Sequence, residues 1–189
     1  MESGCFTIAH LSDIHCGDPH FVPDLMERAI ADINALEPDI VVCSGDLTTY
    51  GFKEEYVQAR RYLDGIECAS FVVIPGNHDS RNVVYDAGDA LECLQRAGVN
   101  LVLSGHKHVP YAWKLENLFV VNTGTVSTLR LRGNTRPCYN VVEVTGTHVA
   151  IWRRYPFHGS EKIIQFDLET LEYEKYTTRI EDEVTAGRR

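Results

Sequence analysis

The first two thirds of the chain alternate between short apolar runs and segments in which apolar residues recur at helical spacing. Continuous apolar runs predict strands buried on both faces, and such runs lie at residues 6–11, 40–43, 71–74 and 99–103. Helical spacing predicts helices at residues 24–36, 53–63 and 86–97. We expect Asp24 to cap the first helix after Pro23, and Pro38 to end it. Strands that alternate with helices in this way predict a parallel-rich sheet with right-handed crossovers.

The pattern changes after residue 109, where helical spacing gives way to successive strand-like segments. These segments lie at residues 111–115, 118–121, 139–144, 148–155, 162–166 and 171–177. Turn-forming residues such as Asn117 and Gly146 separate several of them, which favours an antiparallel meander. The expected fold class is therefore α/β, with a parallel-rich first sheet and antiparallel C-terminal strands.

Length and composition narrow the possibilities further. A chain of 189 residues, 44% of them apolar, is long enough for one domain with a buried core. We expect that domain at residues 1–180 and a polar tail at residues 181–189. The formal net charge of −9 argues against binding to duplex nucleic acid, because that needs a basic surface. With no leader-like segment and no apolar run of about 18 residues, we expect a cytoplasmic protein that does not contact membranes.

Polar residues typical of metal sites follow each of the four buried runs. The four groups are Ser12-Asp13-Ile14-His15, Ser44-Gly45-Asp46, Gly76-Asn77-His78-Asp79 and Gly105-His106-Lys107-His108. In an open parallel sheet, ligands collect beyond the carboxyl ends of the strands, so these groups are expected to meet. Carboxylate and imidazole ligands without a thiolate suit manganese, iron, cobalt or zinc. A glycine before a ligand permits positive φ and close backbone approach.

The order of these motifs resembles that of the calcineurin-like metallophosphoesterase superfamily, over residues 6–108. The resemblance implies a four-layer αββα sandwich and hydrolysis of phosphate esters by a hydroxide activated at a centre of two divalent metal ions. It also implies the ligands: Asp13, His15 and His108 for one ion, Asn77 and His106 for the other, with Asp46 as a bridge. His78 is implied as the proton donor to the leaving oxygen or as a stabiliser of charge at the phosphate, and Asp79 could orient its imidazole.

The sequence departs from the family in one place. Family members carry a further metal-ligand histidine between the GNHD and GHxH motifs, but residues 80–104 contain no histidine. A single Arg81-Asn82-Val83 stretch stands where related sequences have two similar ones, which indicates an internal deletion. We therefore expect weaker occupancy of the second metal site, unless His20 supplies the absent ligand. Loss of a strand would also leave a sheet edge uncovered, which favours a homodimer.

Two functions of different classes remain open at this point. The first is a metal-dependent phosphoesterase, with phosphodiesters slightly favoured over monoesters and a phosphorylated small molecule or nucleotide as substrate. Its activity could be impaired by the absent ligand. The second is a degenerate, non-catalytic relative that binds metal and acts as an interaction module.

Overall fold

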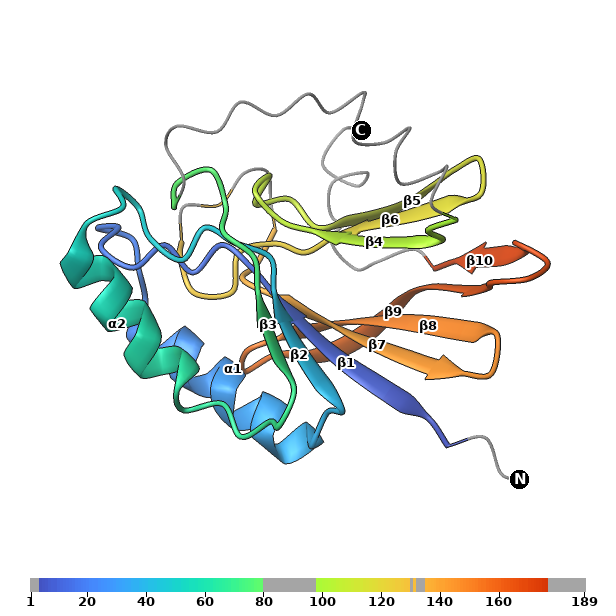
Figure 1. Cartoon of the computed structure of the whole chain (residues 1–189), viewed down its shortest axis with the longest axis horizontal. Coiled ribbons are helices and arrows are strands. Elements are labelled where there is room, and N and C mark those ends of the chain that lie inside the picture. The colour runs from blue at the N-terminus through green and yellow to red at the C-terminus, as the bar shows by residue number, and fades with distance from the viewer. Residues whose placement is uncertain (1–3, 80–97, 130, 132–134, 177–189) are drawn as a thin grey trace, which may run out of the picture.

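The computed structural model describes residues 4–79, 98–129, 131 and 135–176. These residues form two helices and ten strands (Figure 1). The elements are β1 (Phe6–Leu11), α1 (Pro23–Leu36), β2 (Ile40–Cys43), α2 (Lys53–Leu63), β3 (Phe71–Val73), β4 (Leu101–Ser104), β5 (Tyr111–Leu115), β6 (Leu118–Asn122), β7 (Tyr139–Thr145), β8 (His148–Tyr155), β9 (Gly159–Asp167) and β10 (Tyr173–Lys175). Every predicted strand, and the first two predicted helices, are thereby confirmed in type and approximate position. The predicted helix at 86–97 and the predicted tail at 181–189 lie outside the described residues.

The start of α1 differs from the expectation. Val22 is the N-cap residue and makes no side-chain capping bond, while Pro23 occupies the first helical turn. Asp24 therefore lies inside the first turn, so its prediction as the N-cap is wrong. The fixed φ of proline suits the first helical position, and a carboxylate there interacts favourably with the helix dipole.

The strands form a seven-stranded sheet in the order β10-β9-β8-β7-β1-β2-β3 and a three-stranded sheet in the order β4-β6-β5. β1, β2 and β3 are parallel, as predicted, and β7 to β10 form the predicted antiparallel meander. The meander joins the large sheet because β7 pairs antiparallel with β1. The fourth apolar run, β4, was expected beside the other three but pairs with β6 in the small sheet. Apolar periodicity reports that a strand is buried, and it does not say which strand will be its partner.

Helices α1 and α2 cover one face of the large sheet, and the small sheet faces the other (Figure 1). One apolar core lies under the helices and includes Met26, Ile33 and Tyr139. A second core lies between the two sheets and includes Phe119, Ile151 and Phe166. The fold is therefore a mixed α/β layered sandwich. Neither described helix has the length and apolar composition that would let it cross a membrane.

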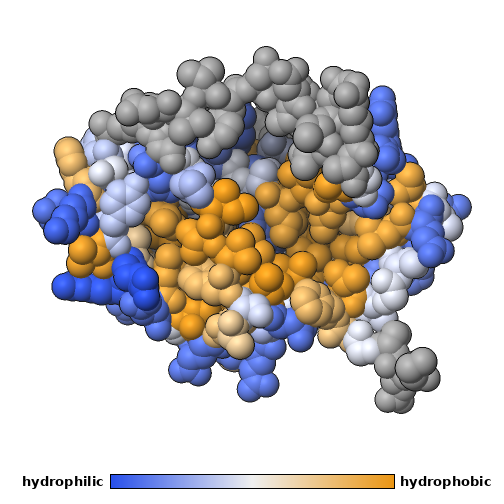
Figure 2. All heavy atoms as spheres, viewed as in Figure 1, coloured by the Kyte–Doolittle hydropathy of each residue, from blue (hydrophilic) through white to orange (hydrophobic). Residues whose placement is uncertain are grey.

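Among the described strands, β3 is at one end of the large sheet, and apolar side chains in it and directly after it lie at the surface. Val72, Val73 and Ile74 are all exposed. Figure 2 shows apolar residues gathered at the centre of this face, around β3 and the line where the two sheets face each other. An apolar edge strand is the feature expected if a neighbouring strand has been lost. This exposed edge supports the predicted homodimer, which stays a prediction.

His10 occupies a buried polar position on β1, three residues before the first predicted metal ligand. Its Nε2 lies 2.8 Å from the hydroxyl oxygen of Ser44, which ties the ends of β1 and β2 together. Burial lowers the pKa of His10 to about 4, although the nearby negative charge of Asp13 acts to raise it. His10 is therefore neutral in the folded protein at neutral pH.

We expect the pKa of His10 to make stability depend on pH. Between pH 6.5 and 4 the unfolded chain takes up a proton that the folded protein does not, so the free energy of unfolding decreases as the pH falls through this window. From pH 7.5 to pH 5, His10 should contribute a loss of about 2 kcal/mol. Urea denaturation of wild type and His10→Gln at both pH values isolates this contribution, with His158→Gln as the control at an exposed position. An equal pH dependence of the wild type and His10→Gln would contradict the prediction.

Candidate metal centre

The loops that follow β1, β2, β3 and β4 meet at one end of the molecule (Figure 1). Backbone hydrogen bonds join the first two of them, since the N–H groups of Asp13 and His15 donate to the carbonyls of Gly45 and Asp46, each at 3.0 Å. The fourth loop joins them because the backbone N–H of His106 donates to Asp13 Oδ2 at 2.8 Å. The strand-end motifs therefore converge, although β4 belongs to the other sheet.

Asp13, His15 and His108 form a buried cluster in which one ligand atom from each lies within 4.8 Å of the others. The Nε2 atoms of His15 and His108 are 2.9 Å apart, and Asp13 Oδ1 lies 3.7 Å and 3.3 Å from them. Burial acts to raise the pKa of Asp13, but the imidazoles of His108 and His15 and other donors hold it well below its usual range. Asp13 is therefore a carboxylate at neutral pH.

The donor set of this cluster fits a divalent cation. Asp13 Oδ1 is buried and has no hydrogen-bond partner among the described residues, which is costly for a carboxylate oxygen. Two imidazole nitrogens converge on the same point as that oxygen. A borderline metal ion would satisfy all three atoms at once.

Asp46 is buried beside this cluster and contacts two other predicted site residues. Its Oδ1 accepts the backbone N–H of His78 at 3.0 Å, and its Oδ2 lies 3.5 Å from Nδ1 of His106. The side chain of His106 is half exposed, so this part of the site is open to solvent. Asn77 is exposed in the turn after β3. Asp46 and His106 therefore lie together, in a part of the molecule that is more open than the buried cluster.

The backbone is strained at most of the predicted ligands. Five of the six have positive φ, between 53° and 75°: Asp13, His15, Asp46, His106 and His108. This conformation is costly for residues other than glycine, by roughly 1 kcal/mol or more at each position. Such strain persists only where surrounding contacts enforce it, and it is concentrated at functional sites. The loops therefore hold these side chains in fixed directions.

Glycines allow the loops to approach one another. Gly45 has φ of +92°, and a Cβ there would lie 2.5 Å from the backbone nitrogen of Gly76. A Cβ on Gly76 would overlap Asp46 Oδ1, and one on Gly105 would lie 2.6 Å from Asp13 Oδ2. Close packing therefore requires the glycine that precedes a ligand in three of the four motifs, as the sequence predicted.

His78 lies beside the buried cluster, with its ring 4.9 Å from the ring of His15 in a T-shaped arrangement. Its Nδ1 is 2.8 Å from the carbonyl oxygen of Thr49, so Nδ1 carries the proton and Nε2 is left for other partners. Asp79 was expected to orient this imidazole, but its carboxylate instead accepts the backbone N–H groups of Leu47, Thr48 and Gly76. Thr49 orients the ring, and Asp79 holds the loop that carries Asp46.

Hydroxyl side chains that were not singled out in the sequence also support the site. Thr125 Oγ1 donates to the carbonyl of Asp13 at 2.6 Å, and Ser127 Oγ donates to the carbonyl of Ile14 at 3.0 Å. Both come from the segment after β6, more than 100 residues away along the chain. Such residues carry no local signal, because only tertiary contact gives them this role. His20, considered as a replacement ligand, is exposed and its backbone N–H bonds Asp18.

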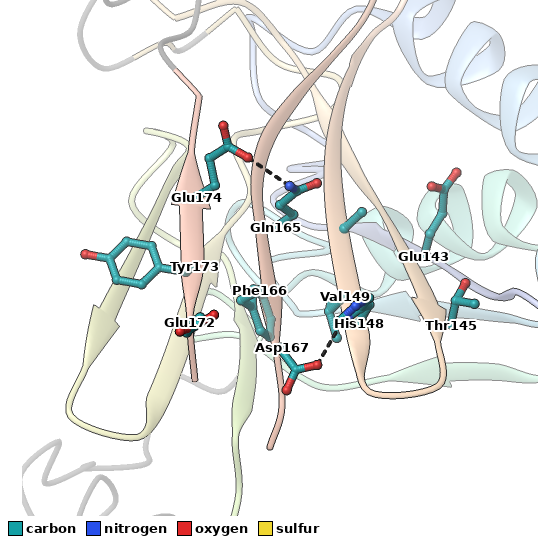
Figure 3. Close-up of a pocket in the computed structure, with 11 residues that line it drawn as sticks. Glu143, Thr145, His148, Val149, Gln165, Phe166, Asp167, Glu172, Tyr173 and Glu174 are labelled. Atoms are coloured by element: carbon teal, nitrogen blue, oxygen red, sulfur yellow. Dashed lines mark hydrogen bonds and ion pairs between the residues drawn. The ribbon is translucent and has the colours of Figure 1, made fainter. Parts of the chain in front are cut away.

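A cavity of about 440 Å³ lies elsewhere, by the turn between β7 and β8 and the end of β9 (Figure 3). Its polar groups largely satisfy one another: His148 pairs with Asp167 at 2.7 Å, and Gln165 donates to Glu174 at 2.9 Å. Thr145 lies at the end of β7 where Phe6 begins β1, whereas the candidate metal centre follows the other end of β1. This cavity is therefore separate from the metal centre.

Comparison with known proteins gives matches to the sequence and to the fold. Residues 6–93 match the family model for calcineurin-like phosphoesterases. A curated relative, the glycerophosphodiester phosphodiesterase GpdQ of Enterobacter lignolyticus, is 35% identical over 83 residues. That match covers 39% of this chain and only 30% of the relative.

Several solved structures share the fold at low sequence identity. Vps29 of Entamoeba histolytica in complex with zinc has a TM-score of 0.60 at 17% identity, over 86% of this chain and 99% of that one. Vps29 of Chaetomium thermophilum with a cyclic peptide has a TM-score of 0.54 at 15% identity, over 91% and 96%. YfcE, a phosphoesterase from E. coli, has a TM-score of 0.51 at 15% identity, over 89% and 96%. Identities this low establish a common architecture and no more.

Proposed function

Residues 6–93 match the family model for calcineurin-like phosphoesterases, and from this premise we propose that the chain is a metal-dependent hydrolase of phosphate esters that prefers phosphodiesters. The observation that carries the proposal is the buried Asp13, His15 and His108 cluster beside Asp46. The match to a glycerophosphodiester phosphodiesterase supports the preference for diesters. It spans less than a third of that relative, so substrate identity needs its own test.

We assign the first divalent cation to Asp13, His15 and His108 and the second to Asn77 and His106, with Asp46 shared between them. Manganese, iron, cobalt and zinc all suit this donor set. Bound cations supply Lewis-acid stabilisation of a phosphoryl group and lower the pKa of water. The exposure of His106 and Asn77, and the absence of histidine from residues 80–104, support weaker binding at the second site.

His78 is positioned to assist the leaving group. Thr49 fixes its Nδ1 as the protonated nitrogen, and Asp46 accepts its backbone N–H, so one bond holds the ring and the other holds the backbone that carries it. In the imidazolium form, Nε2 would also carry a proton and could donate it to the departing oxygen.

Two exposed aromatic residues next to His78 support a substrate with a ring, such as a nucleotide. The rings of Tyr50 and Phe52 are 5.8 Å apart, and both residues closely follow Thr49, which bonds His78. The buried carboxylate of Glu55 accepts the backbone N–H groups of both, at 3.0 Å and 2.9 Å. These bonds fix the backbone that carries the two exposed aromatic rings, close in sequence to Thr49, and a nucleobase could stack on such rings.

We expect Phe52→Ala to discriminate between substrates. Loss of one stacking ring should reduce kcat/KM about tenfold for a diester of a nucleoside 5′-phosphate, with most of the effect in KM. Hydrolysis of glycerophosphoethanolamine, which has no ring, should change little. Steady-state kinetics on both substrates tests this, with Val57→Ala as the control for loss of an exposed apolar side chain on α2. Equal losses on both substrates would reject stacking at Phe52.

The proposed activity is tested with purified protein, added manganese and bis(p-nitrophenyl) phosphate. We expect hydrolysis above the buffer rate, and only a modest decrease in His78→Gln on this substrate, because p-nitrophenolate needs no proton to leave. His158→Gln removes an exposed histidine in the same way and should retain full activity. For an alkyl diester, whose leaving oxygen must take up a proton, the decrease in His78→Gln should be about 10²–10³-fold.

One observation favours a second candidate, a non-catalytic metal-binding interaction module. The fold is shared with Vps29, a protein whose structures include complexes with zinc and with a cyclic peptide. The second half of the site is also open and lacks one histidine of the family pattern. Metal bound at about one ion per chain, with no hydrolysis of any diester above the buffer rate, would support the module and overturn the hydrolase.

A further inference from the structure

A cavity of about 360 Å³ lies between α1 and the hairpin of β8 and β9. Its lining is Arg28, Asp32, Arg154, Tyr155, Phe157, Gly159 and Ser160. None of the predicted metal ligands lines it. The cavity therefore needs an explanation separate from the metal centre.

Hydrogen-bond donors of three neighbouring strands form a row beside this cavity. Arg154 on β8 lies directly opposite Tyr139 on β7 and opposite Ser160 on β9. Directly opposed residues of antiparallel strands place their side chains on the same face of the sheet. Arg154 and Ser160 line the cavity, and Tyr139 is their completely buried neighbour in the same row.

Two of these donors are unsatisfied. The hydroxyl of Tyr139 and the Nε of Arg154 are buried and have no hydrogen-bond partner within the part of the chain that the structure describes. Burial raises the pKa of Tyr139 to about 12, although the charge of the adjacent Arg154 and its side-chain interaction with the hydroxyl oppose the increase, so the hydroxyl keeps its own proton and can still donate it. Unsatisfied buried donors are rare in folded proteins and indicate a partner that protein atoms do not provide.

The charges around the cavity favour an anion as that partner. Arg28 lies 2.9 Å from Asp32 and 5.6 Å from the centre of the Phe157 ring, so its charge is neutralised and its position is fixed. Arg154 is then the unbalanced charge of the lining, in a chain whose net charge is −9. Phosphate oxygens accept several hydrogen bonds at once and match the geometry of a guanidinium group.

We propose that this cavity is a binding site for a phosphate-type oxyanion, held by Arg154 with the hydroxyls of Tyr139 and Ser160 and with Arg28 at its rim. The anion is either free inorganic phosphate or the phosphoryl group of a small phosphomonoester. This site is independent of the metal centre and of the proposed hydrolase activity.

The site is tested by thermal unfolding of the full chain in increasing inorganic phosphate at constant ionic strength. Asp46→Asn serves as the background, because it weakens phosphate binding at the metal centre. A tenfold excess of phosphate over its Kd should raise Tm by about 4 °C. Adding Arg154→Met should abolish the increase, and adding Tyr139→Phe should weaken phosphate binding severalfold. Arg60→Met, the same change on α2, is the matched control and should leave the increase intact.

A second measurement uses wild-type protein and does not depend on variants that fold. Phosphate should protect Arg154 from phenylglyoxal, as read by peptide mass spectrometry, and should leave Arg60 reactive. An equal Tm increase with glycerol 3-phosphate identifies a phosphoryl group on a small molecule, whereas an increase with inorganic phosphate alone identifies the free anion. A Tm increase that survives Arg154→Met, or absence of protection at Arg154, overturns the proposal. Hydrolysis of bis(p-nitrophenyl) phosphate by the single variant Arg154→Met should match the wild type.

Discussion

Asp46→Asn should reduce kcat/KM for a phosphodiester by about 10³-fold, or ~4 kcal/mol of transition-state stabilisation. Asp46 is the proposed shared ligand, so the loss of its charge weakens both cation positions together. Its Oδ1 also accepts the backbone N–H of His78 at 3.0 Å, and an asparagine oxygen can still do so. The variant should therefore fold like the wild type and lose activity through the loss of charge.

Measurement of Asp46→Asn combines kinetics with metal analysis. Hydrolysis of bis(p-nitrophenyl) phosphate gives the rate, and metal content per chain after dialysis gives the occupancy. Asp64→Asn makes the same change at an exposed carboxylate that ends α2 and pairs with Arg60, so its rate and metal content should be unchanged. Wild-type activity in Asp46→Asn would refute the assignment of Asp46 as a shared ligand.

Gly76→Ala should damage the site by steric overlap. The added Cβ would overlap Asp46 Oδ1, and the backbone N–H of Gly76 also donates to Asp79 Oδ2 at 2.9 Å. The loop therefore cannot move away without breaking a hydrogen bond that holds it. We expect the free energy of unfolding to fall by about 3 kcal/mol, and metal binding to fall with it, because the Asp46 carboxylate must turn.

Urea denaturation and metal analysis of Gly76→Ala test both effects. Gly4→Ala is the matched control, because no atom lies within 4 Å of the position that its Cβ would occupy. Gly4 should tolerate the methyl group with little change in stability. If Gly76→Ala kept wild-type stability and metal content, the close contact between Gly76 and Asp46 would not be a feature of the folded protein.

The local sequence pattern determined most of the secondary structure and the residue types of the candidate metal site. The bounds of α2, β1, β2 and β8 follow directly from the spacing of apolar residues, because that spacing records which side of an element is buried. The residue types that follow each buried run indicate a metal site by themselves, since carboxylate and imidazole groups recur there. Both signals are carried by neighbouring residues, so a single sequence reveals them.

Tertiary structure decided the rest. β4 pairs with β6 and β7 pairs with β1, because strand partners are set by packing between distant segments and not by the strand's own sequence. The same holds for Asp79, whose carboxylate binds the loop of Asp46, and for Thr125, which supports Asp13 from across the chain. The row formed by Tyr139, Arg154 and Ser160 exists only through the register of three strands, so the cavity beside it could be found only in the folded molecule.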